Sequence, residues 1–446
     1  MYEIAKRWVA TGHKVDVITC VPNVPNGVIY EGYKNRLRQT DFMDGIRVIR
    51  VWTYIAANKG TLKRTLNYLS YMISALFAGL FVPRPDVVIA TSPQFFCGWA
   101  GVLVAKVRRL PFILEIRDIW PESIVAVGAM RNRWLLRLLE WLEKKMYAAP
   151  KHIVTVGEGY KEKLIEKGVR AKDISVITNG VDRDAFHPCE ADRKIKRRYN
   201  LDGHFICGYV GTIGMACGLD VVLGAARILK DKKRNDVRFM LVGDGAIKDQ
   251  LREQTASKGL EDIIIFIGRQ DRQMIPSFLS TVDSCLVHLR KTELFKTVLP
   301  SKIFEAAAMA KPIVLGVEGC AADLVNSAGA GICIEPESAE QLVAALERLA
   351  DDRELCREFG QAGHKYVMKH YDYDKLARKY LDATIKTHKT WGRTRSRGIA
   401  SVSADQPTDH GGRVPEKKAG AMPVAERRGD RTSGRERTVK QPDGFP

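Results

Sequence analysis

The sequence predicts an α/β protein with two doubly wound domains, each a parallel sheet covered by helices on both faces. Short β-branched runs alternate with helix-length amphipathic segments, which is the pattern of strand–helix–strand units. The alternation occurs in two series, and 446 residues are too many for one core. The predicted strands are VDVITC, RVIRVW, DVVIAT, FILEIR and HIVTV in the first series and FICGYVG, VRFMLVG, IIIFIG, DSCLVHL, PIVLG and GICIE in the second.

The boundary between the two domains is predicted in the segment TNGVDRDAFHP. Asn179-Gly180 supplies a turn there, and Pro188 ends the segment. We therefore expect one domain at 1–180 and the other at 181–371.

The C-terminal end of the chain is predicted to contain a helix and a tail. The helix, over 372–390, is expected to pack back towards the N-terminal domain. After Trp391 the composition changes to Gly, Arg, Ser, Pro and Asp without apolar periodicity. Such a segment buries too little apolar surface to fold, so 391–446 is predicted to be a disordered basic tail.

The N-terminal domain is expected to lack its first strand. A doubly wound domain normally opens with a strand whose turn leads into the first helix, but Met1 already lies in that helix. Either the start is assigned too late or the chain is truncated. We expect an extension upstream of Met1 to restore a β-branched strand and a Gly-rich turn, because loss of a central strand exposes the edges of both its neighbours.

Charge and cysteine content narrow the class of partner and the compartment. The net charge of +19 favours an anionic partner, which could be nucleic acid, an anionic membrane surface or a phosphorylated substrate. No nucleic-acid recognition motif is found, so nucleic acid is not expected as the partner. The nine cysteines form no C-x-x-C pair, which is typical of reduced thiols in the cytoplasm.

One apolar segment bears on membrane contact. Residues Leu66 to Val82 are uncharged and are preceded by Lys63 and Arg64. Three interpretations of this segment stay open: a helix packed on the sheet, a helix lying in the plane of an anionic membrane, and a membrane-spanning helix. For a membrane-spanning helix the segment is slightly short.

The stretch LPSKIFEAAAMAKPIVLG carries two charges in an otherwise apolar helix. Pro300 and Ser301 mark the helix start, so Lys302 lies in the first turn, and Glu305 follows on the same face. A cation in the first turn opposes the helix dipole unless an anion is held there. Lys302 and the backbone N–H groups are therefore expected to bind phosphate, and Glu305 to accept hydrogen bonds from ribose hydroxyls. The alternative is a surface ion pair.

Five motifs together carry a resemblance to a known family. They are RDIWPES at 117–123, TNGVD at 178–182, GTIGMACGLD at 211–220, LVGDG at 241–245 and LPSKIFEAAAMAKPIV at 299–314. From Met1 to about His388 the chain resembles the retaining glycosyltransferases of family 4, which have the GT-B architecture of two facing Rossmann-like domains. It is most similar to the branch of L-fucosamine and colanic-acid-type transferases.

The resemblance implies an activity, a location and a role for each domain. The enzyme would be a hexosyltransferase that moves an N-acetyl-amino or deoxy hexose to a glycan or lipid-linked acceptor in bacterial surface polysaccharide synthesis, such as lipopolysaccharide or capsule. The first domain would hold the acceptor and the second the nucleotide sugar. UDP-linked N-acetyl-fucosamine is the preferred donor and GDP-fucose the next. The protein would lie peripherally on the inner face of the cytoplasmic membrane.

The family's paired-glutamate motif is only half present. Glu305 matches the second glutamate, which holds the donor ribose, and Thr297 stands where the first is expected. Thr297, Pro300 and Ser301 are therefore the candidates for contact with the donor sugar.

The donor nucleotide is expected to lie on glycine loops of the second domain. Gly211, Thr212 and Gly214 follow a strand and precede a helix, so their backbone can approach the diphosphate. The family usually has an Arg and a Lys here, and their absence makes Lys302 the main phosphate cation, with Arg269 or Arg290 as a second. Gly268 and Arg269 occupy the loop that lies against the base in the family. Asp244 in LVGDG is predicted to be a helix N-cap.

In the first domain, Arg117 and Asp118 follow a buried strand at the edge where open α/β sheets bind ligands. Arg117 could hold a phosphate or the donor sugar, and Asp118 could accept the acceptor's hydroxyl proton. With Lys302 they are the candidate catalytic residues. A buried Arg117–Asp118 structural pair is the alternative, and Glu122 either caps the turn or faces the cleft.

No D-x-D motif follows an apolar strand in the way that metal-dependent transferases need. We therefore expect neither a metal nor another cofactor, with the nucleotide sugar as co-substrate. Two other functions stay open: a nucleotide-sugar epimerase or phosphorylase, and a non-catalytic subunit that keeps the fold.

Overall fold

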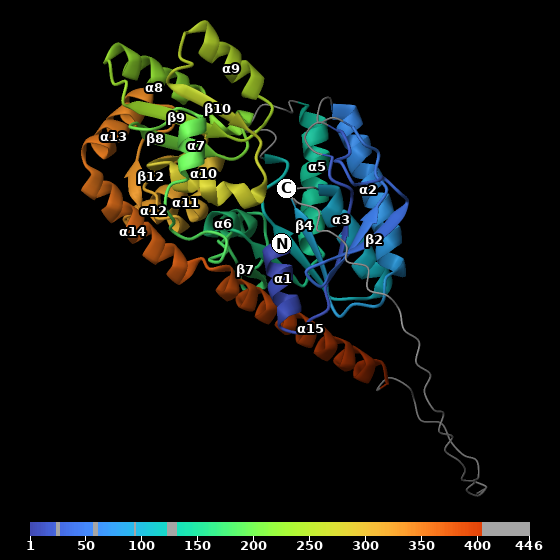
Figure 1. The fold of residues 1–446 in the computed structure, drawn as a ribbon. Coiled ribbons are helices and arrows are strands. Elements are labelled where there is room, and N and C mark those ends of the chain that lie inside the picture. The colour runs from blue at the N-terminus through green and yellow to red at the C-terminus, as the bar shows by residue number, and fades with distance from the viewer. Residues whose placement is uncertain (24–26, 57–60, 93–94, 123–131, 404–446) are drawn as a thin grey trace, which may run out of the picture.

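The C-terminal lobe is built on a six-stranded parallel sheet in the order β10-β9-β8-β11-β12-β13 (Figure 1). The computed structural model describes residues 1–23, 27–56, 61–92, 95–122 and 132–403, with the backbone alone for residue 61 and residues 393–403. The strands are β8 (Phe205–Val210), β9 (Val237–Val242), β10 (Ile264–Gly268), β11 (Ser284–His288), β12 (Ile313–Gly316) and β13 (Gly331–Cys333). Each coincides with a predicted β-branched run, because a strand buried on both faces needs no polar alternation.

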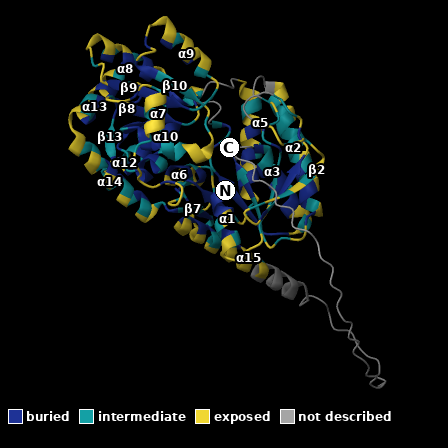
Figure 2. Cartoon of the chain, in the orientation of Figure 1, coloured by how far each residue is buried: buried dark blue, intermediate teal, exposed yellow. Residues whose placement is uncertain are grey.

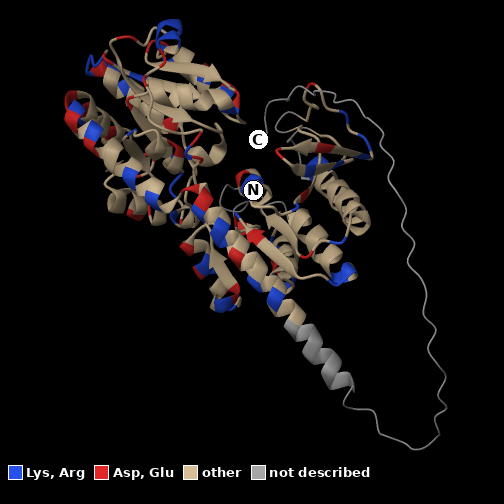
Figure 3. Cartoon of the chain, turned by 60° about the horizontal axis from the view of Figure 1, so that its bottom comes forward, with Lys and Arg blue, Asp and Glu red and all other residues tan. Residues whose placement is uncertain are grey.

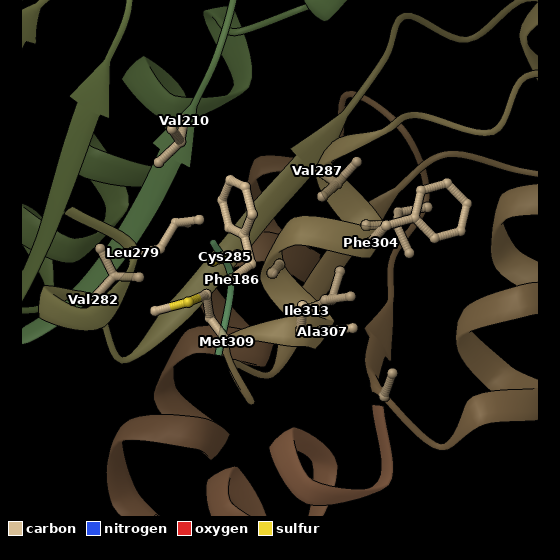
Figure 4. Close-up of a cluster of buried hydrophobic side chains, with 14 of the residues drawn as sticks. Phe186, Val210, Leu279, Val282, Cys285, Val287, Phe304, Ala307, Met309 and Ile313 are labelled. Carbon is tan, nitrogen blue, oxygen red and sulfur yellow. The ribbon is translucent and has the colours of Figure 1, made fainter. Parts of the chain in front are cut away.

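Helices cover both faces of this sheet, and the buried strands lie between them (Figure 2). One face carries α8 (Asp220–Asp231), α9 (Lys248–Ser257) and α13 (Ala339–Asp351). The other carries α7 (Arg193–Arg198), α10 (Ile275–Thr281), α11 (Lys302–Ala308), α12 (Cys320–Ala328) and α14 (Arg353–His370). Ala307 in α11 packs near Ile313 of β12 in this second cluster, where a small side chain lets the helix lie close to the sheet (Figure 4).

The N-terminal lobe contains two sheets rather than one. Four parallel strands have the order β4-β5-β6-β7, and a separate sheet has the order β1-β3-β2, with β2 antiparallel to β3. The strands are β1 (Asp16–Thr19), β2 (Arg38–Met43), β3 (Ile46–Val51), β4 (Val88–Ser92), β5 (Phe112–Ile116), β6 (His152–Thr155) and β7 (Ile174–Val176). The expectation of purely parallel strands is therefore wrong for β2, which the sequence analysis missed together with the short β7.

Helix α1 (Tyr2–Ala10) lies against both N-terminal sheets. Ile4 and Trp8 pack with Ile113 of β5, and Ala5 packs with Ile46 of β3. Among the described strands, none pairs with the free edge of β1 or with that of β4. The two sheets are therefore joined through side chains of α1 and not through a continuous ladder.

The remaining N-terminal helices are α2 (Thr61–Phe81), α3 (Phe95–Arg108), α5 (Arg133–Ala148) and α6 (Glu158–Glu166). Short 3-10 turns are η1 (Ala171–Asp173), η2 (Met215–Cys217), η3 (Arg272–Met274) and η4 (Leu294–Thr297). In the part of the chain that the structure describes, no helix combines the length and apolarity needed to cross a bilayer, so the spanning reading of Leu66 to Val82 is wrong. That segment is most of α2, which packs on α3.

Helix α15 (Tyr373–Ser403) returns from the C-terminal lobe to the N-terminal lobe (Figures 1 and 3). Trp8 of α1 donates a hydrogen bond through its indole N–H to the Ala377 carbonyl at 2.9 Å and meets the Tyr380 ring edge-on at 5.2 Å. The helix continues past residue 391, where the disordered tail was predicted to begin. The prediction of disorder is therefore wrong for residues 391–403. Residues 404–446 lie outside the described part.

Candidate functional site

The strand order of the C-terminal sheet reverses between β8 and β11. In open parallel sheets, ligands bind outside the carboxyl ends of the strands at such a reversal. Loop Gly211–Gly214 follows β8, and the segment leading to α11 follows β11. The topology therefore places the two motifs singled out from the sequence at one edge of the sheet.

Lys302 lies across Gly211. A Cβ atom at position 211 would overlap Cε of Lys302, and Gly211 has φ +142°, which only glycine adopts readily. The Lys302 ammonium lies 5.1 Å from the centre of the Tyr209 ring. The glycine therefore lets the cation reach the loop after β8.

Glu305 lies one turn deeper and is half-buried. It lines a small pocket with Lys302 and Gly208. Burial raises the pKa of the Glu305 carboxyl, and the charges of Lys302 and Arg272 only partly oppose this. Among the described residues, no side chain or N–H group hydrogen-bonds this carboxylate, and it forms no ion pair with Lys302. The surface ion-pair alternative is therefore wrong.

The loop after β8 is held by its neighbours in a way that leaves two N–H groups available. The Gly211 N–H donates to Val242 at 2.8 Å, and the Ile213 N–H donates to the Asp244 carbonyl at 2.9 Å. Among the described residues, the N–H groups of Thr212 and Gly214 have no protein acceptor. These two groups and Lys302 form a site suited to an anion.

Residues on the far side of this loop fix its shape. Arg290 donates to the Met215 carbonyl at 2.8 Å and pairs with Asp220 and Glu337 at 2.9 and 3.0 Å. Its guanidinium thus braces the loop, which is a different task from that of a second phosphate cation. The sequence did not show this, because Asp220 and Glu337 are distant along the chain.

His288 at the end of β11 is a second brace that the sequence analysis missed. Its Nε2 accepts a hydrogen bond from the Glu337 N–H at 2.8 Å, so Nδ1 carries the proton and donates to the Cys217 carbonyl at 2.8 Å. Burial lowers the pKa of His288, which keeps the ring neutral. In the sequence, the only sign of this role was a single histidine at the end of a buried strand.

Arg269 reaches the other lobe. Gly268 ends β10 with φ +79°, and Arg269 follows on the surface. The Arg269 guanidinium lies 4.8 Å from the centre of the Tyr30 ring and donates to the Tyr30 hydroxyl. Arg272 similarly pairs with Glu3 of α1 at 3.3 Å. Both arginines therefore bridge the two lobes.

The three candidates for contact with the donor sugar form hydrogen bonds to near neighbours in the chain. The Thr297 hydroxyl donates to the Leu294 carbonyl at 2.7 Å, and Thr297 packs directly on Gly159 of α6. Pro300 and Ser301 accept hydrogen bonds from Ile303 and Phe304 through their carbonyls. Thr297 is therefore a contact between the lobes in this structure.

In the N-terminal lobe, Arg117 joins two of the motifs. It donates to Asn179 at 2.6 Å and to Glu115 of β5 at 3.2 Å. The ion pair that the structure describes for Arg117 is with Glu115, at 3.2 Å. Asp118 lies near Tyr160, where its charge adds to the effect of burial in raising the pKa of that phenol.

The loop that carries Arg117 and Asp118 is tied down by an ion network. Lys167 pairs with Glu122 at 2.8 Å and with Glu143 of α5 at 2.9 Å. Burial raises the pKa of Glu143, and the hydrogen bond from Lys167 only partly opposes this. Burial by itself would lower the pKa of Lys167, but the hydrogen bonds to Glu122 and Glu143 raise that pKa above its ordinary value. Glu122 thus anchors the loop, and the sequence analysis missed Glu143 and Lys167 because they meet only in the fold.

We expect Lys167→Met to lower the free energy of unfolding by about 1.5–3 kcal/mol, because it leaves the buried Glu143 carboxylate without its charged partner. Urea denaturation at pH 7 measures this. The control is Lys161→Met in α6, the helix that Lys167 caps at its C-terminus. The partner of Lys161, Glu158, is exposed, and loss of this pair should cost at most about 0.5 kcal/mol. Equal stability of the two variants would show that the network contributes nothing.

Asp244 does not cap a helix. Its carboxylate accepts from the Gly245 N–H at 2.9 Å and pairs with Lys248 at 3.1 Å, while the N-cap of α9 is Ile247. The N-cap prediction is therefore wrong, because the helix begins later than the glycine turn suggested. Within the described ranges, no three His, Cys, Asp or Glu side chains gather as a metal site.

Comparisons with known proteins agree over both lobes. Residues 1–180 match the family model described as a glycosyl transferase 4-like domain, and residues 191–366 match glycosyl transferases group 1. WcaI of Escherichia coli strain K12, by its name a glycosyl transferase of colanic acid biosynthesis, is 27% identical over 391 residues, which cover 85% of this chain and 94% of WcaI.

Solved structures share the fold at low sequence identity. Sucrose-phosphate synthase from Thermosynechococcus elongatus superposes with a TM-score of 0.64 at 16% identity, covering 90% of this chain and 92% of that one. Anabaena Alr3699/HepE in complex with UDP-glucose superposes with a TM-score of 0.62 at 16% identity, covering 83% and 99%.

Proposed function

Because the chain belongs to family 4 of the glycosyltransferases and has the GT-B fold, we propose that this glycosyltransferase uses a UDP-linked donor whose diphosphate lies on the loop after β8. The single observation that carries the proposal is the position of Lys302 across Gly211, beside the N–H groups of Thr212 and Gly214. These groups match the charge and the acceptor atoms of a diphosphate.

Glu305 supplies the second part of the donor site. Its carboxylate is half-buried, has no described protein partner and lies next to Lys302 in the same pocket. Two vicinal ribose hydroxyls would satisfy it and would return the solvation that burial removes. That UDP and UDP-glucose occur in structures of the same fold favours uridine as the base.

The chemistry follows from where charge develops. When the bond from the sugar to the diphosphate breaks, negative charge grows on the leaving oxygen, and the Lys302 ammonium stabilises it without a metal ion. Asp118 accepts the proton of the attacking acceptor hydroxyl, and Arg117, held by Glu115 and Asn179, orients the donor sugar or its phosphate. Same-face attack gives retention, so no enzymic nucleophile is needed.

The proposed substrates are those of bacterial surface polysaccharide synthesis. The similarity to WcaI, which by its name acts in colanic acid biosynthesis, supports this class of pathway. Within it, the proposed acceptor is a glycan or lipid-linked glycan and the proposed transferred sugar is an N-acetyl-amino or deoxy hexose. A lipid-linked acceptor and the basic chain favour a peripheral position on the inner face of the cytoplasmic membrane. Glu122, anchored through Lys167, serves to hold the loop near the acceptor.

A thermal-shift series with UDP, GDP and UMP tests the donor assignment. We expect UDP to raise the Tm most, since a ligand at 100 times its Kd stabilises the folded state by about 2.7 kcal/mol. UMP lacks the second phosphate of the diphosphate, so it would make fewer contacts with Lys302 and the loop and should raise the Tm less. A larger shift with GDP would change the base and leave the mechanism standing, whereas no shift with any nucleotide would contradict the proposal.

Incubation with the UDP-sugar separates the remaining alternatives. Turnover only in the presence of a glycan acceptor supports transfer. Epimerisation or phosphorolysis without an acceptor would identify the other enzyme class, and nucleotide binding without any turnover would identify a non-catalytic subunit.

A further inference from the structure

The outer face of helix α5 exposes a stripe of large apolar side chains. Trp134, Leu138 and Trp141 are 73%, 38% and 56% exposed and recur at the spacing of one helical face. Isolated exposed apolar residues are ordinary, but two tryptophans on one turn-by-turn stripe are not. The opposite face of α5 is buried and carries Glu143 of the ion network.

Cations flank this stripe. The exposed side chains Arg133, Arg137, Lys144 and Lys145 stand against a single exposed acid, Glu140. The Lys145 ammonium lies 5.8 Å from the centre of the Trp141 ring. The face is therefore both apolar and strongly positive.

Helix α2 carries a second stripe in the same layer of helices. Its exposed residues include Ile73, Phe77 and Phe81, at 51%, 58% and 74%. Helix α3 packs against both α2 and α5, and Arg108 of α3 donates to the Gly79 carbonyl of α2 at 2.8 Å. Figure 1 shows the three helices side by side on the N-terminal lobe.

We propose that the outer face of the α2–α3–α5 layer docks on an anionic phospholipid bilayer, with Trp134 and Trp141 inserted at the interface. Tryptophan favours the boundary between headgroups and acyl chains, because its ring is apolar and its N–H is polar. The four cations of α5 complement anionic headgroups. A second copy of the chain placed face to face would instead bring these cations together.

The proposal deepens the proposed function, since a lipid-linked acceptor lies in a bilayer. Helix α5 begins at Arg133 in the lobe that carries Arg117 and Asp118, and its buried face holds Glu122 through Lys167. One helix thus contacts the bilayer on one side and supports the acceptor loop on the other. From the sequence, membrane contact was considered for the apolar run in α2, and the tryptophan stripe of α5 was not predicted.

Co-sedimentation with vesicles tests the docking face directly. The full chain should bind phosphatidylcholine vesicles that contain phosphatidylglycerol at least tenfold better than pure phosphatidylcholine vesicles, and the preference should weaken in high salt. Trp134→Ser/Trp141→Ser should lower the partition coefficient for the anionic vesicles at least tenfold. Arg133→Gln/Arg137→Gln/Lys144→Gln/Lys145→Gln should abolish the preference for phosphatidylglycerol.

A matched control uses helix α15, which lies elsewhere on the molecule. Ile385→Ser/Trp391→Ser removes one aliphatic residue and one tryptophan from α15 and should leave vesicle binding unchanged. The UDP-induced thermal shift should persist in every variant, which shows that each still folds.

Two outcomes would overturn the proposal. Unchanged vesicle binding in Trp134→Ser/Trp141→Ser would remove the stripe from the interface. Sedimentation velocity that shows a dimer lost in the same variant, with no lipid binding by the parent chain, would assign the face to a second copy. A persisting UDP shift in either case leaves the donor proposal intact, so the two failures are distinguishable.

Discussion

Glu305→Ala weakens the binding of UDP by more than tenfold and does not lower the free energy of unfolding. The carboxylate would form two ribose hydrogen bonds at about 1.5–3 kcal/mol each, and 1.4 kcal/mol corresponds to a factor of ten in affinity. The folded chain gains little from this group, because burial raises its pKa and no described residue pairs with it. Isothermal titration calorimetry with UDP measures the first effect and urea denaturation the second.

The raised pKa also gives the variant a pH signature. A carboxyl whose pKa rises on folding favours the folded state when protonated, so stability falls as pH rises from the ordinary value of 4.5 through the raised value. Glu305→Ala should lack this fall. Glu293→Ala is the control, because Glu293 is 89% exposed and should change neither property. Unchanged UDP affinity in Glu305→Ala would contradict the ribose role.

Lys302→Ala lowers kcat by about 10²–10³-fold, the usual effect of removing one preorganised group that stabilises charge in the transition state. The KM for the donor should change less, because the charge on the leaving oxygen develops only as the bond breaks. Steady-state kinetics with the nucleotide-sugar donor measure both. The control is Lys296→Ala, since the Lys296 ammonium is engaged with Glu293 and Glu318.

Two further comparisons isolate the role of Lys302. Gly211→Ala should reproduce the loss, because the added Cβ would overlap Lys302 and the φ of +142° would be strained. With a glycoside donor that has a neutral leaving group, Lys302→Ala should lose much less activity. Equal losses with both donors would show that the lysine does not act on leaving-group charge.

The strands of the C-terminal lobe could be predicted because each lies in a short apolar run, and β8, β11 and β12 are buried along their whole length. The strands of the N-terminal lobe were harder to predict. RQTDFM in β2 alternates polar and apolar residues as an edge strand does, and the three residues of β7 are too few to show a period. The stop of α15 was also misplaced, because composition after Trp391 changes before the helix ends.

The candidate site divides in the same way. Lys302, Glu305 and the glycines of 211–214 could be selected from spacing and residue type, because helical neighbours and tight turns are local properties. Whether a cation is available for a ligand is not local. Arg290 is engaged with Asp220 and Glu337, and Thr297 packs on Gly159, through contacts that join residues far apart in the chain.

By itself, the sequence determined the α/β class, the two series of strands, the glycine loops and the pair Lys302 and Glu305. Each depends on residues within a few positions of one another. Only the tertiary structure decided that Lys302 crosses Gly211, that Lys167 joins Glu122 to the buried Glu143, and that α5 presents Trp134 and Trp141 outward. The physical reason is that burial and ion pairing between distant residues are properties of the packed lobes, since the same side chain is buried or exposed according to what the fold brings against it.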